Sequence, residues 1–309
     1  MQELLRTISL TDYNTRVVVL GVAALGLACG WVGTFMLLRK RALMGDALSH
    51  ATFPGICVAF MLFQLIADGG GKSLPVLLSG AVVSGVLGVL CVMWIRNQTR
   101  IKEDAAMGIV LSVFFGLGTA LRGIIQKMPG SNSAGLDGFI YGKTASMTSF
   151  DAWLIGVIAM ISCGVLLLMY KELKLLCFDE SFAKGVGFST TRLDIVLMGL
   201  VTLVTVVGLQ AVGLILVIAL LIIPSASARF WTDRLGVMVL IAGLIGATSA
   251  VGGALISAVV PNTPSGATIV LTSFGCFLLS LIFGIRRGLM IRQRTLRKAQ
   301  QEILLRAKL

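Results

Sequence analysis

Residues 195–228 read IVLMGLVTLVTVVGLQAVGLILVIALLIIPSASA, a run of 34 positions without a charged side chain. A run this apolar indicates a segment inside a lipid bilayer. As one α-helix it would measure about 51 Å, whereas the hydrocarbon core is about 30 Å thick. The stretch therefore forms either two short spans, with a turn near Gly208–Gly213, or one broken helix.

The rest of the chain has the same character. Apolar residues make up 57% of the 309 positions and charged residues 13%, with a mean hydropathy of +0.96. Soluble domains carry about a quarter charged residues, so lipid must face most of this surface. The stretch 235–285 is divided by the turn Pro261-Asn262-Thr263-Pro264, which lipid would not accept, into spans 235–260 and 265–285. Five further runs are long and apolar enough to cross a bilayer: 17–38, 47–67, 73–95, 105–121 and 152–170.

The positive-inside rule indicates whether residues 195–228 form one membrane span or two. If it forms two spans, 195–209 and 212–228, and the N-terminus is outside, the inner side holds 20 of the 26 Lys and Arg; as one span it leaves 10 inside. The sequence therefore predicts an all-α polytopic membrane helical bundle of about nine transmembrane helices. It has an outer N-terminal segment 1–16, a transmembrane domain 17–287, and a basic cytoplasmic tail 288–309.

Neither the net charge nor the cysteines indicate other chemistry. The net charge of +12 follows the membrane topology and forms no aromatic-studded basic patch, so we expect no nucleic-acid partner. The six cysteines are scattered singly without a CxxC pair, and we interpret them as small apolar residues.

Few ionisable residues lie within the spans, and such residues are functional candidates. The single histidine of the chain, His50, follows Asp46 by four positions, so both side chains share one helix face. A carboxylate oxygen and an imidazole nitrogen suit Mn²⁺, Fe²⁺ or Zn²⁺ better than Cu(I). Alternatively, Asp46 caps the helix and His50 forms a hydrogen bond in the core. Two ligands do not complete a divalent site, and a symmetric second subunit would supply two more.

Pro54-Gly55 follows in the same span. Proline removes a backbone hydrogen bond and kinks a helix, and glycine adds flexibility. The pair predicts either a fixed kink or a hinge that moves Asp46 and His50.

The inner segment 171–194 has an amphipathic pattern. Such a helix either docks a soluble partner or lies on the bilayer interface. The apolar stripe comprises Leu173, Leu176, Phe178, Phe182 and Val186, and the polar side Lys174, Asp179, Glu180 and Lys184.

Taken together, these motifs resemble those of a known protein family. Gly45-Asp46-Ala47-Leu48-Ser49-His50 with Pro54-Gly55 resembles the signature of the zinc, manganese and iron class of ABC importer permeases. Three further runs resemble that family along residues 17–287. They are Phe178-Asp179-xxx-Ala183-xxx-Gly187, Gly213-Leu214-Ile215-Leu216-Val217-Ile218-Ala219-Leu220-Leu221-Ile222-Ile223-Pro224, and Pro264-Ser265-Gly266-Ala267-x-Ile269-Val270.

The resemblance implies a permease domain in a bacterial inner membrane, with Asp46 and His50 as ligands of the transported metal. It implies that Phe178, Asp179, Ala183 and Gly187 form a coupling segment for cytoplasmic ABC ATPase subunits. It also implies an extracytoplasmic metal-binding protein and a second permease copy or related permease. The version of the motif with Ser49-His50 and Pro54 resembles manganese and iron transporters more than zinc transporters.

No permanently bound cofactor is expected. The sequence contains no GxxxxGK[ST] motif, so ATP is expected on a partner subunit. An ion-coupled secondary metal transporter would need several buried carboxylates, and the spans contain almost none. An intramembrane enzyme using His50 would need a second histidine or a GxSxG elbow, and neither is present.

Overall fold

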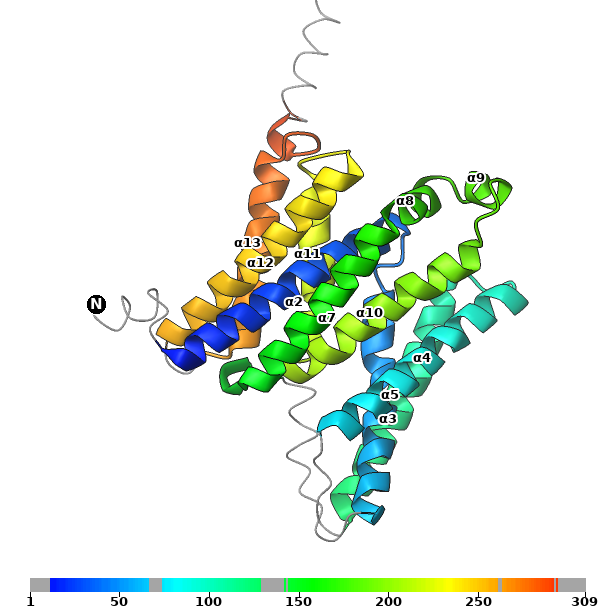
Figure 1. Ribbon diagram of the computed structural model, residues 1–309, viewed down its shortest axis with the longest axis vertical. Coiled ribbons are helices and arrows are strands. Elements are labelled where there is room, and N and C mark those ends of the chain that lie inside the picture. The colour runs from blue at the N-terminus through cyan, green and yellow to red at the C-terminus, as the bar shows by residue number, and fades with distance from the viewer. Residues whose placement is uncertain are drawn as a thin grey trace, which may run out of the picture.

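The computed structural model describes residues 12–66, 74–128, 142, 144–260, 263–291 and 293. Within these residues every regular element is a helix, which confirms the all-α bundle (Figure 1). The long apolar helices are α2 (Tyr13–Leu38), α3 (Met44–Ile66), α4 (Leu74–Gln98), α5 (Glu103–Lys127), α7 (Ser149–Leu168), α10 (Thr190–Val212), α12 (Leu235–Val259) and α13 (Ser265–Phe283), and α11 (Leu214–Arg229) is a shorter apolar helix. The shorter elements are η1 (Thr144–Ser146), α8 (Tyr170–Phe178) and α9 (Glu180–Gly185).

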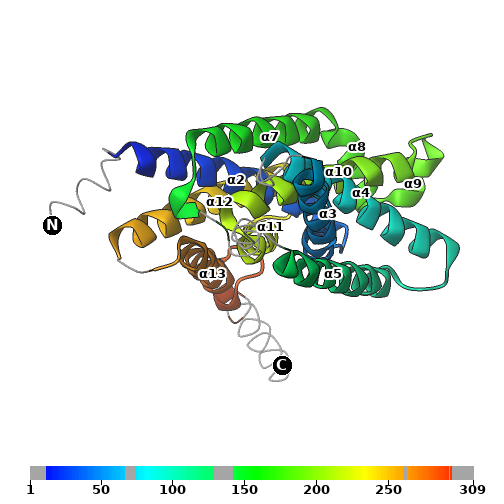
Figure 2. The same cartoon turned by 90° about the horizontal axis from the view of Figure 1, so that it is seen from below.

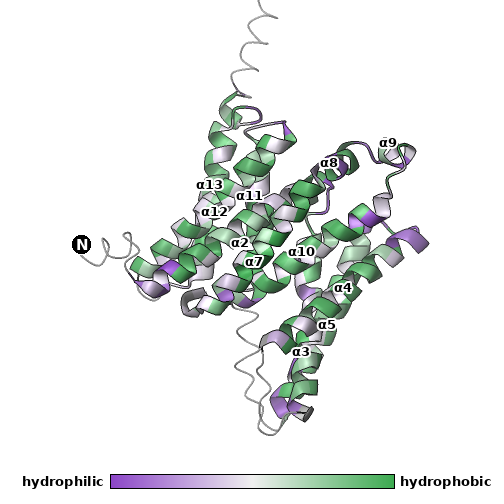
Figure 3. Ribbon diagram, in the orientation of Figure 1, coloured by the Kyte–Doolittle hydropathy of each residue, from purple (hydrophilic) through white to green (hydrophobic). Residues whose placement is uncertain are grey.

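The span count agrees with a polytopic membrane protein. Eight helices in the described part of the chain are long and apolar enough to cross a bilayer, and α11 is a shorter apolar helix of 16 residues. Coloured by hydropathy, the helices are apolar along their lengths and polar mainly near their ends (Figure 3). Polar ends and apolar shafts are what a bilayer requires of a spanning helix.

The break in the stretch 195–228 is a single residue. Helix α10 continues to Val212, and α11 begins at Leu214. Gly213 between them has a φ of 84°, which residues with a side chain rarely adopt. The turn is therefore sharper than the predicted segment Gly208–Gly213, and α10 extends beyond both ends of the predicted span 195–209.

The helices form two neighbouring groups. Helices α3, α4 and α5 pack against one another, while α2 packs against α7, α11 and α12 (Figure 1). Helix α11 lies among α2, α12 and α13, as the view in Figure 2 shows. A Cβ atom on Gly26 of α2 would collide with the backbone of Gly246 of α12, so these two helices meet backbone to backbone.

The predicted N-terminal and C-terminal segments consist largely of residues that the structure does not describe. Of the predicted outer segment 1–16, the structure describes residues 12–16, and α2 begins at Tyr13. Of the predicted tail 288–309, it describes residues 288–291 and 293. The assignment of one end to the outside and the other to the cytoplasm stays a prediction.

Candidate metal site and coupling surface

Asp46 and His50 lie on one face of the first two turns of α3. His50 Nε2 is 3.4 Å from Asp46 Oδ1, so the two side chains converge as the spacing predicts. The side chain of His50 is 19% exposed and that of Asp46 is 35% exposed, so the pair is open on one side. An oxygen and a nitrogen donor held this close can bind one divalent cation together.

The imidazole of His50 is held by an aromatic neighbour. Its ring meets Phe115 of α5 edge to face, with centroids 4.8 Å apart and planes at 75°. Its Nδ1 is buried and has no hydrogen-bond partner. Buried polar atoms are normally bonded, so this nitrogen gives no support to the alternative in which His50 makes a core hydrogen bond.

The pair is not a complete metal site within the described residues. Those residues contain no group of three or more His, Cys, Asp or Glu side chains that could hold a metal ion. Hard divalent ions usually take six or more ligands, so water or another protein chain would have to supply the rest.

The predicted hinge lies at a close contact between helices. Pro54 is inside α3 and cannot donate a hydrogen bond to the carbonyl oxygen of His50, one turn earlier. A Cβ atom on Gly55 would collide with the carbonyl of Gly80 on α4. The Ser84 hydroxyl of α4 donates to the carbonyl oxygen of Ala51. Gly55 therefore permits close packing of α3 on α4, at the point where the proline weakens α3.

The predicted coupling segment, 171–194, forms two short helices and the start of α10 rather than one amphipathic helix. Helix α8 ends at Phe178, and Asp179 caps α9 by accepting the Phe182 N–H at 2.8 Å. Leu173, Leu176 and Ala183 are buried, whereas Phe178, Phe182 and Val186 are exposed. The predicted apolar stripe is therefore divided between an inward side and an outward side.

The four predicted coupling residues thus have different positions. Phe178 is on the exposed apolar surface, Asp179 is a helix cap, and Ala183 packs inward. Gly187 follows α9 with a φ of 93°, a conformation that favours glycine. We define the docking surface as Phe178, Phe182 and Val186.

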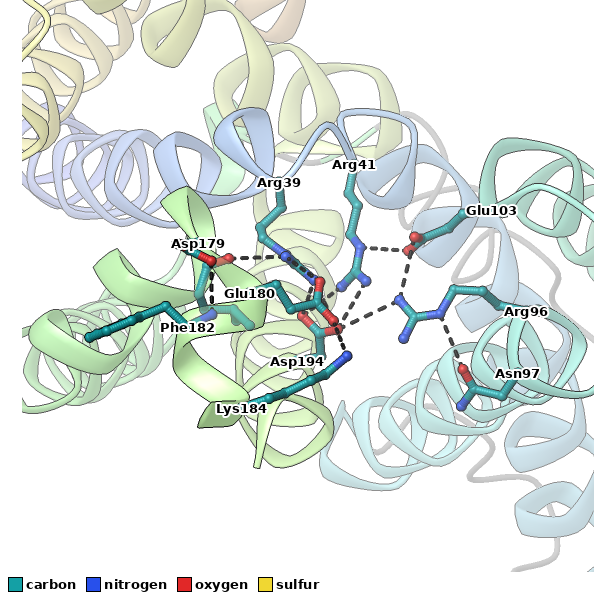
Figure 4. Close-up of polar contacts among 11 residues, drawn as sticks. Arg39, Arg41, Arg96, Asn97, Glu103, Asp179, Glu180, Phe182, Lys184 and Asp194 are labelled. Atoms are coloured by element: carbon teal, nitrogen blue, oxygen red, sulfur yellow. Dashed lines mark hydrogen bonds and ion pairs between the residues drawn. The ribbon is translucent and has the colours of Figure 1, made fainter. Parts of the chain in front are cut away.

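The sequence interpretation missed a cluster of charged side chains at the same end of the bundle. We define the Asp194 network as Arg39, Arg41, Arg96, Glu103, Glu180 and Asp194 (Figure 4). In Figure 4 the three arginines converge on the carboxylate of Asp194, and Arg41 and Arg96 also contact Glu103. The sequence signal was present, since Asp194 is the only acidic residue between Glu180 and Asp233. The basic residues had been interpreted only as markers of topology.

Neighbouring charges alter the acidity of two of these groups. Burial disfavours the charged form of Arg39, but Asp194 and Glu180 more than compensate, and the pKa of Arg39 lies above its ordinary value. A hydrogen bond from Lys184, together with Arg39, lowers the pKa of Glu180 despite partial burial. Both groups are therefore charged at neutral pH.

A bundle of apolar helices that carries a partly buried carboxylate–imidazole pair is typical of a membrane transport protein. Comparison with known proteins makes this class more specific. Residues 11–284 match the ABC 3 transport family.

Two relatives and one solved structure illustrate the similarity. The manganese transport system membrane protein MntC of Bacillus subtilis is 42% identical over 276 residues, which are 89% of this chain and 62% of that protein. The zinc transport system membrane protein TroC of Treponema pallidum is 42% identical over 290 residues, covering 94% of this chain and 95% of TroC. A chain in the structure of PsaBC from Streptococcus pneumoniae in complex with Fab has a TM-score of 0.78 at 30% identity, covering 92% of this chain and 97% of that one.

The chain therefore belongs to the ABC 3 transport family, the membrane subunits of ATP-driven metal importers. It is a multi-pass protein of the bacterial inner membrane and a transport component rather than an enzyme. In this family ATP is hydrolysed on a separate subunit, and neither the secondary transporter nor the enzyme using His50 is favoured.

Proposed function

We propose that this chain is the permease subunit of an importer that carries Mn²⁺ or Fe²⁺ into the cytoplasm, with Zn²⁺ as a possible cargo. The observation that carries the proposal is the Asp46/His50 pair, with 3.4 Å between Oδ1 and Nε2, in a helix that has no other acidic, basic or histidine side chain. An ionisable pair in this position is costly unless it serves the transported ion.

The choice among metals rests on the resemblance of the sequence motif rather than on ligand chemistry. One carboxylate and one imidazole serve Mn²⁺, Fe²⁺ and Zn²⁺, so the donor types alone do not separate them. The relatives named above include a manganese system and a zinc system. The version of the motif in this chain, with Ser49-His50 and Pro54, favours manganese or iron.

A second permease copy, or a related permease, would complete the site. The open side of the pair supports an arrangement in which two Asp46/His50 pairs face one pathway. Pro54 and Gly55 would act as the hinge by which each pair moves during gating. The missing backbone hydrogen bond between Pro54 and the His50 carbonyl supports this role.

The partner proteins follow from the surfaces outside the spans. Phe178, Phe182 and Val186 expose apolar area next to the charged end of the bundle, which supports docking of an ABC ATPase subunit on the cytoplasmic side. An extracytoplasmic metal-binding protein would deliver the metal to the opposite face.

Metal uptake by reconstituted transporter tests the proposal. Asp46→Asn keeps the shape of the side chain but removes the negative charge that offsets desolvation of a divalent cation, so uptake of Mn²⁺ should fall by at least about tenfold. His50→Ala should have a comparable effect. Asp104→Asn is the matched control, because Asp104 is likewise an acidic residue in the first turn of a membrane helix but is exposed.

Two outcomes separate the alternatives. If Asp46 were only a helix cap, asparagine would replace it well and uptake would stay normal. Full Mn²⁺ uptake by well-expressed Asp46→Asn protein therefore refutes the ligand assignment. His50→Cys should lose Mn²⁺ transport and retain part of any Zn²⁺ transport, because thiolate binds zinc far better than manganese.

A further inference from the structure

Asp194 is almost completely buried, yet both of its oxygens contact arginines. Arg39 donates from Nη2 to Oδ1 at 3.1 Å and to Oδ2 at 3.2 Å. Arg41 reaches the same two oxygens from Nη1 and Nη2, each at 3.0 Å. Arg96 Nη1 lies 3.6 Å from Oδ2. The side chain of Asp194 is only 2% exposed, so the charges interact with little screening by water.

The turn between α2 and α3 directs two of these arginines to one carboxylate. Lys40, between Arg39 and Arg41, has a φ of 59° and is the only residue other than glycine with a positive φ in the described chain. The N–H of Lys40 bonds to the carbonyl of Leu37, and the N–H of Arg41 to that of Met36, which is the Schellman motif. A lysine in this conformation costs about 1 kcal/mol relative to the ordinary helical region. The surrounding ion pairs hold the turn in this form.

One side of the network is attached to the coupling segment. Arg39 donates from Nη1 to the carbonyl oxygen of Leu176 at 3.0 Å, near the end of α8. The same nitrogen lies 3.2 Å from Oε2 of Glu180 in the first turn of α9. Arg39 thus joins Asp194 to the two short helices that carry the docking surface.

The other side is attached to the helices that carry the metal pair. The carbonyl oxygen of Arg41 accepts the N–H of Met44 at 2.9 Å, where α3 begins, and Asp46 lies in the first turn of that helix. Arg41 and Arg96 both contact Glu103 at the start of α5. Helix α5 also carries Phe115, which packs on His50.

We propose that Asp194 is a positioning residue that transmits movement of the coupling segment to α3 and α5, and so to Asp46 and His50. This inference rests on the proposed function, since it requires an ATPase that moves α9. A contiguous set of ion pairs connects the two regions, and a displacement of Glu180 or Leu176 acts on Arg39 directly. The turn at Lys40 then carries the displacement to the start of α3.

Stability alone is a weak reason for this arrangement. Buried ion networks often contribute little compared with apolar residues of similar volume, because desolvation of the charges offsets their attraction. Replacing the network with apolar side chains should therefore leave a folded protein. If the network transmits movement, its replacement should reduce the amount of metal transported per ATP hydrolysed.

The first test compares Asp194→Asn with Asp233→Asn in the assembled transporter in proteoliposomes. Asp233 is a matched control because it also pairs with an arginine, Arg287, at 3.1 Å but is exposed. For Asp194→Asn we expect the ATPase subunit to stay bound and to hydrolyse ATP, while the metal transported per ATP falls by about tenfold. The control should keep the normal ratio. An unchanged ratio in both variants overturns the proposal.

A second variant separates transmission from folding. The triple substitution Asp194→Leu, Arg39→Met, Arg41→Met leaves Glu103 paired with Arg96 and Glu180 paired with Lys184. We expect a thermal unfolding temperature close to that of the wild type together with a low ratio of metal to ATP. Normal transport by this variant would mean that the network has no coupling role.

Glu180→Gln provides a test that remains valid if the variants with buried substitutions fail to fold. Glu180 is 40% exposed, so this change should not unfold the protein. It removes the negative charge that pairs α9 with Arg39, and with it the ion pair to Lys184 within α9. We expect the ratio of metal to ATP to fall by at least about threefold. An unchanged ratio overturns the proposal. If the proposed function itself is wrong, the wild-type protein will transport no metal, which distinguishes that failure from this one.

Discussion

The rings of His50 and Phe115 meet edge to face, with centroids 4.8 Å apart, although they belong to different helices. This contact fixes the plane of the imidazole and thereby the direction in which Nε2 faces Asp46. The orientation of the proposed ligand thus depends on a residue that has no metal-binding chemistry of its own.

Phe115→Leu should weaken metal transport without changing the ligands. Leucine keeps the apolar volume but loses the edge-to-face contact, which is worth about 0.5–1.5 kcal/mol, so the apparent KM for metal should rise by about threefold to tenfold. Uptake measured over a range of Mn²⁺ concentrations checks this. Phe150→Leu, at an exposed phenylalanine of α7, should behave as the wild type. Equal KM values for the two variants would contradict the prediction.

Labelling of engineered cysteines tests the orientation. Ser149 and Ser181 are both exposed serines near the start of a helix, α7 and α9 respectively. With the N-terminus outside, a maleimide that cannot cross the membrane should label Ser149→Cys on intact cells and should reach Ser181→Cys only after lysis. The reverse pattern would invert the topology. The end of α10 is less suitable for such labelling, because Leu209, Ala211 and Val212 are buried.

Phe182→Asp should release the ATPase while leaving the permease folded. Phe182 is 58% exposed, so the charge meets water in the free permease, but docking would desolvate it. Pull-down of the ATPase with detergent-solubilised permease measures the effect, with Phe150→Asp as the control. Undiminished ATPase binding would favour a helix that lies on the bilayer interface. Ala183→Asp is a poorer test, because Ala183 is fully buried and a charge there would disrupt α9 itself.

Gly187→Ala should loosen the end of the coupling segment. An alanine at a φ of 93° costs about 1–2 kcal/mol in backbone energy, although no neighbouring atom would obstruct its Cβ. Hydrogen exchange of residues 180–188 should become faster. Gly185→Ala is the matched control, since Gly185 also has open space around it but ends α9 in a helical conformation, where alanine is favoured. Equal exchange rates in the two variants would show that Gly187 is not conformationally required.

Cys177 should be almost inert toward thiol reagents at neutral pH. Burial, mainly, raises the pKa of its thiol to about 12, so very little of the reactive thiolate is present at pH 7.5. Because the pKa is raised, reactivity should increase only as the pH approaches 12, and a change from pH 7.5 to 9 should leave Cys177 far slower than an exposed cysteine at position 181. Rates of maleimide labelling in a variant retaining Cys177 as its single cysteine, compared with one carrying Ser181→Cys instead, check this. Rapid labelling of Cys177 at pH 7.5 would contradict the burial that the structure assigns.

Features that depend on local sequence could be predicted well. The spacing of Asp46 and His50 lies within one helix, so periodicity alone places both side chains on one face. The break near Gly213 also follows locally, since an uncharged run of 34 residues is too long for one span and glycine is where the chain can turn.

Features that depend on distant partners could not be predicted. The charge of Asp194 placed the start of the predicted span at residue 195, whereas α10 begins at Thr190, where the Ser189 side chain caps it. Asp194 is accommodated inside the helix because Arg39 and Arg41, more than 150 positions earlier in the chain, pair with its carboxylate. Similarly, the side chain of Asp179 caps α9, and this break in the helix separates the exposed Phe182 from the buried Leu173 and Leu176. Hydrophobic periodicity carries no information on either event.

The backbone contact between α2 and α12 sets how freely different positions of this chain can change during evolution. A methyl group at Gly26 would collide with the main chain of Gly246, which no substitution elsewhere can remove. Gly108, Gly116 and Gly123 of α5 have open space around them, so alanine or serine can replace them without a clash. Among naturally occurring relatives, glycine should therefore persist at the first pair and vary at the other three positions, although all five lie in membrane helices of similar composition.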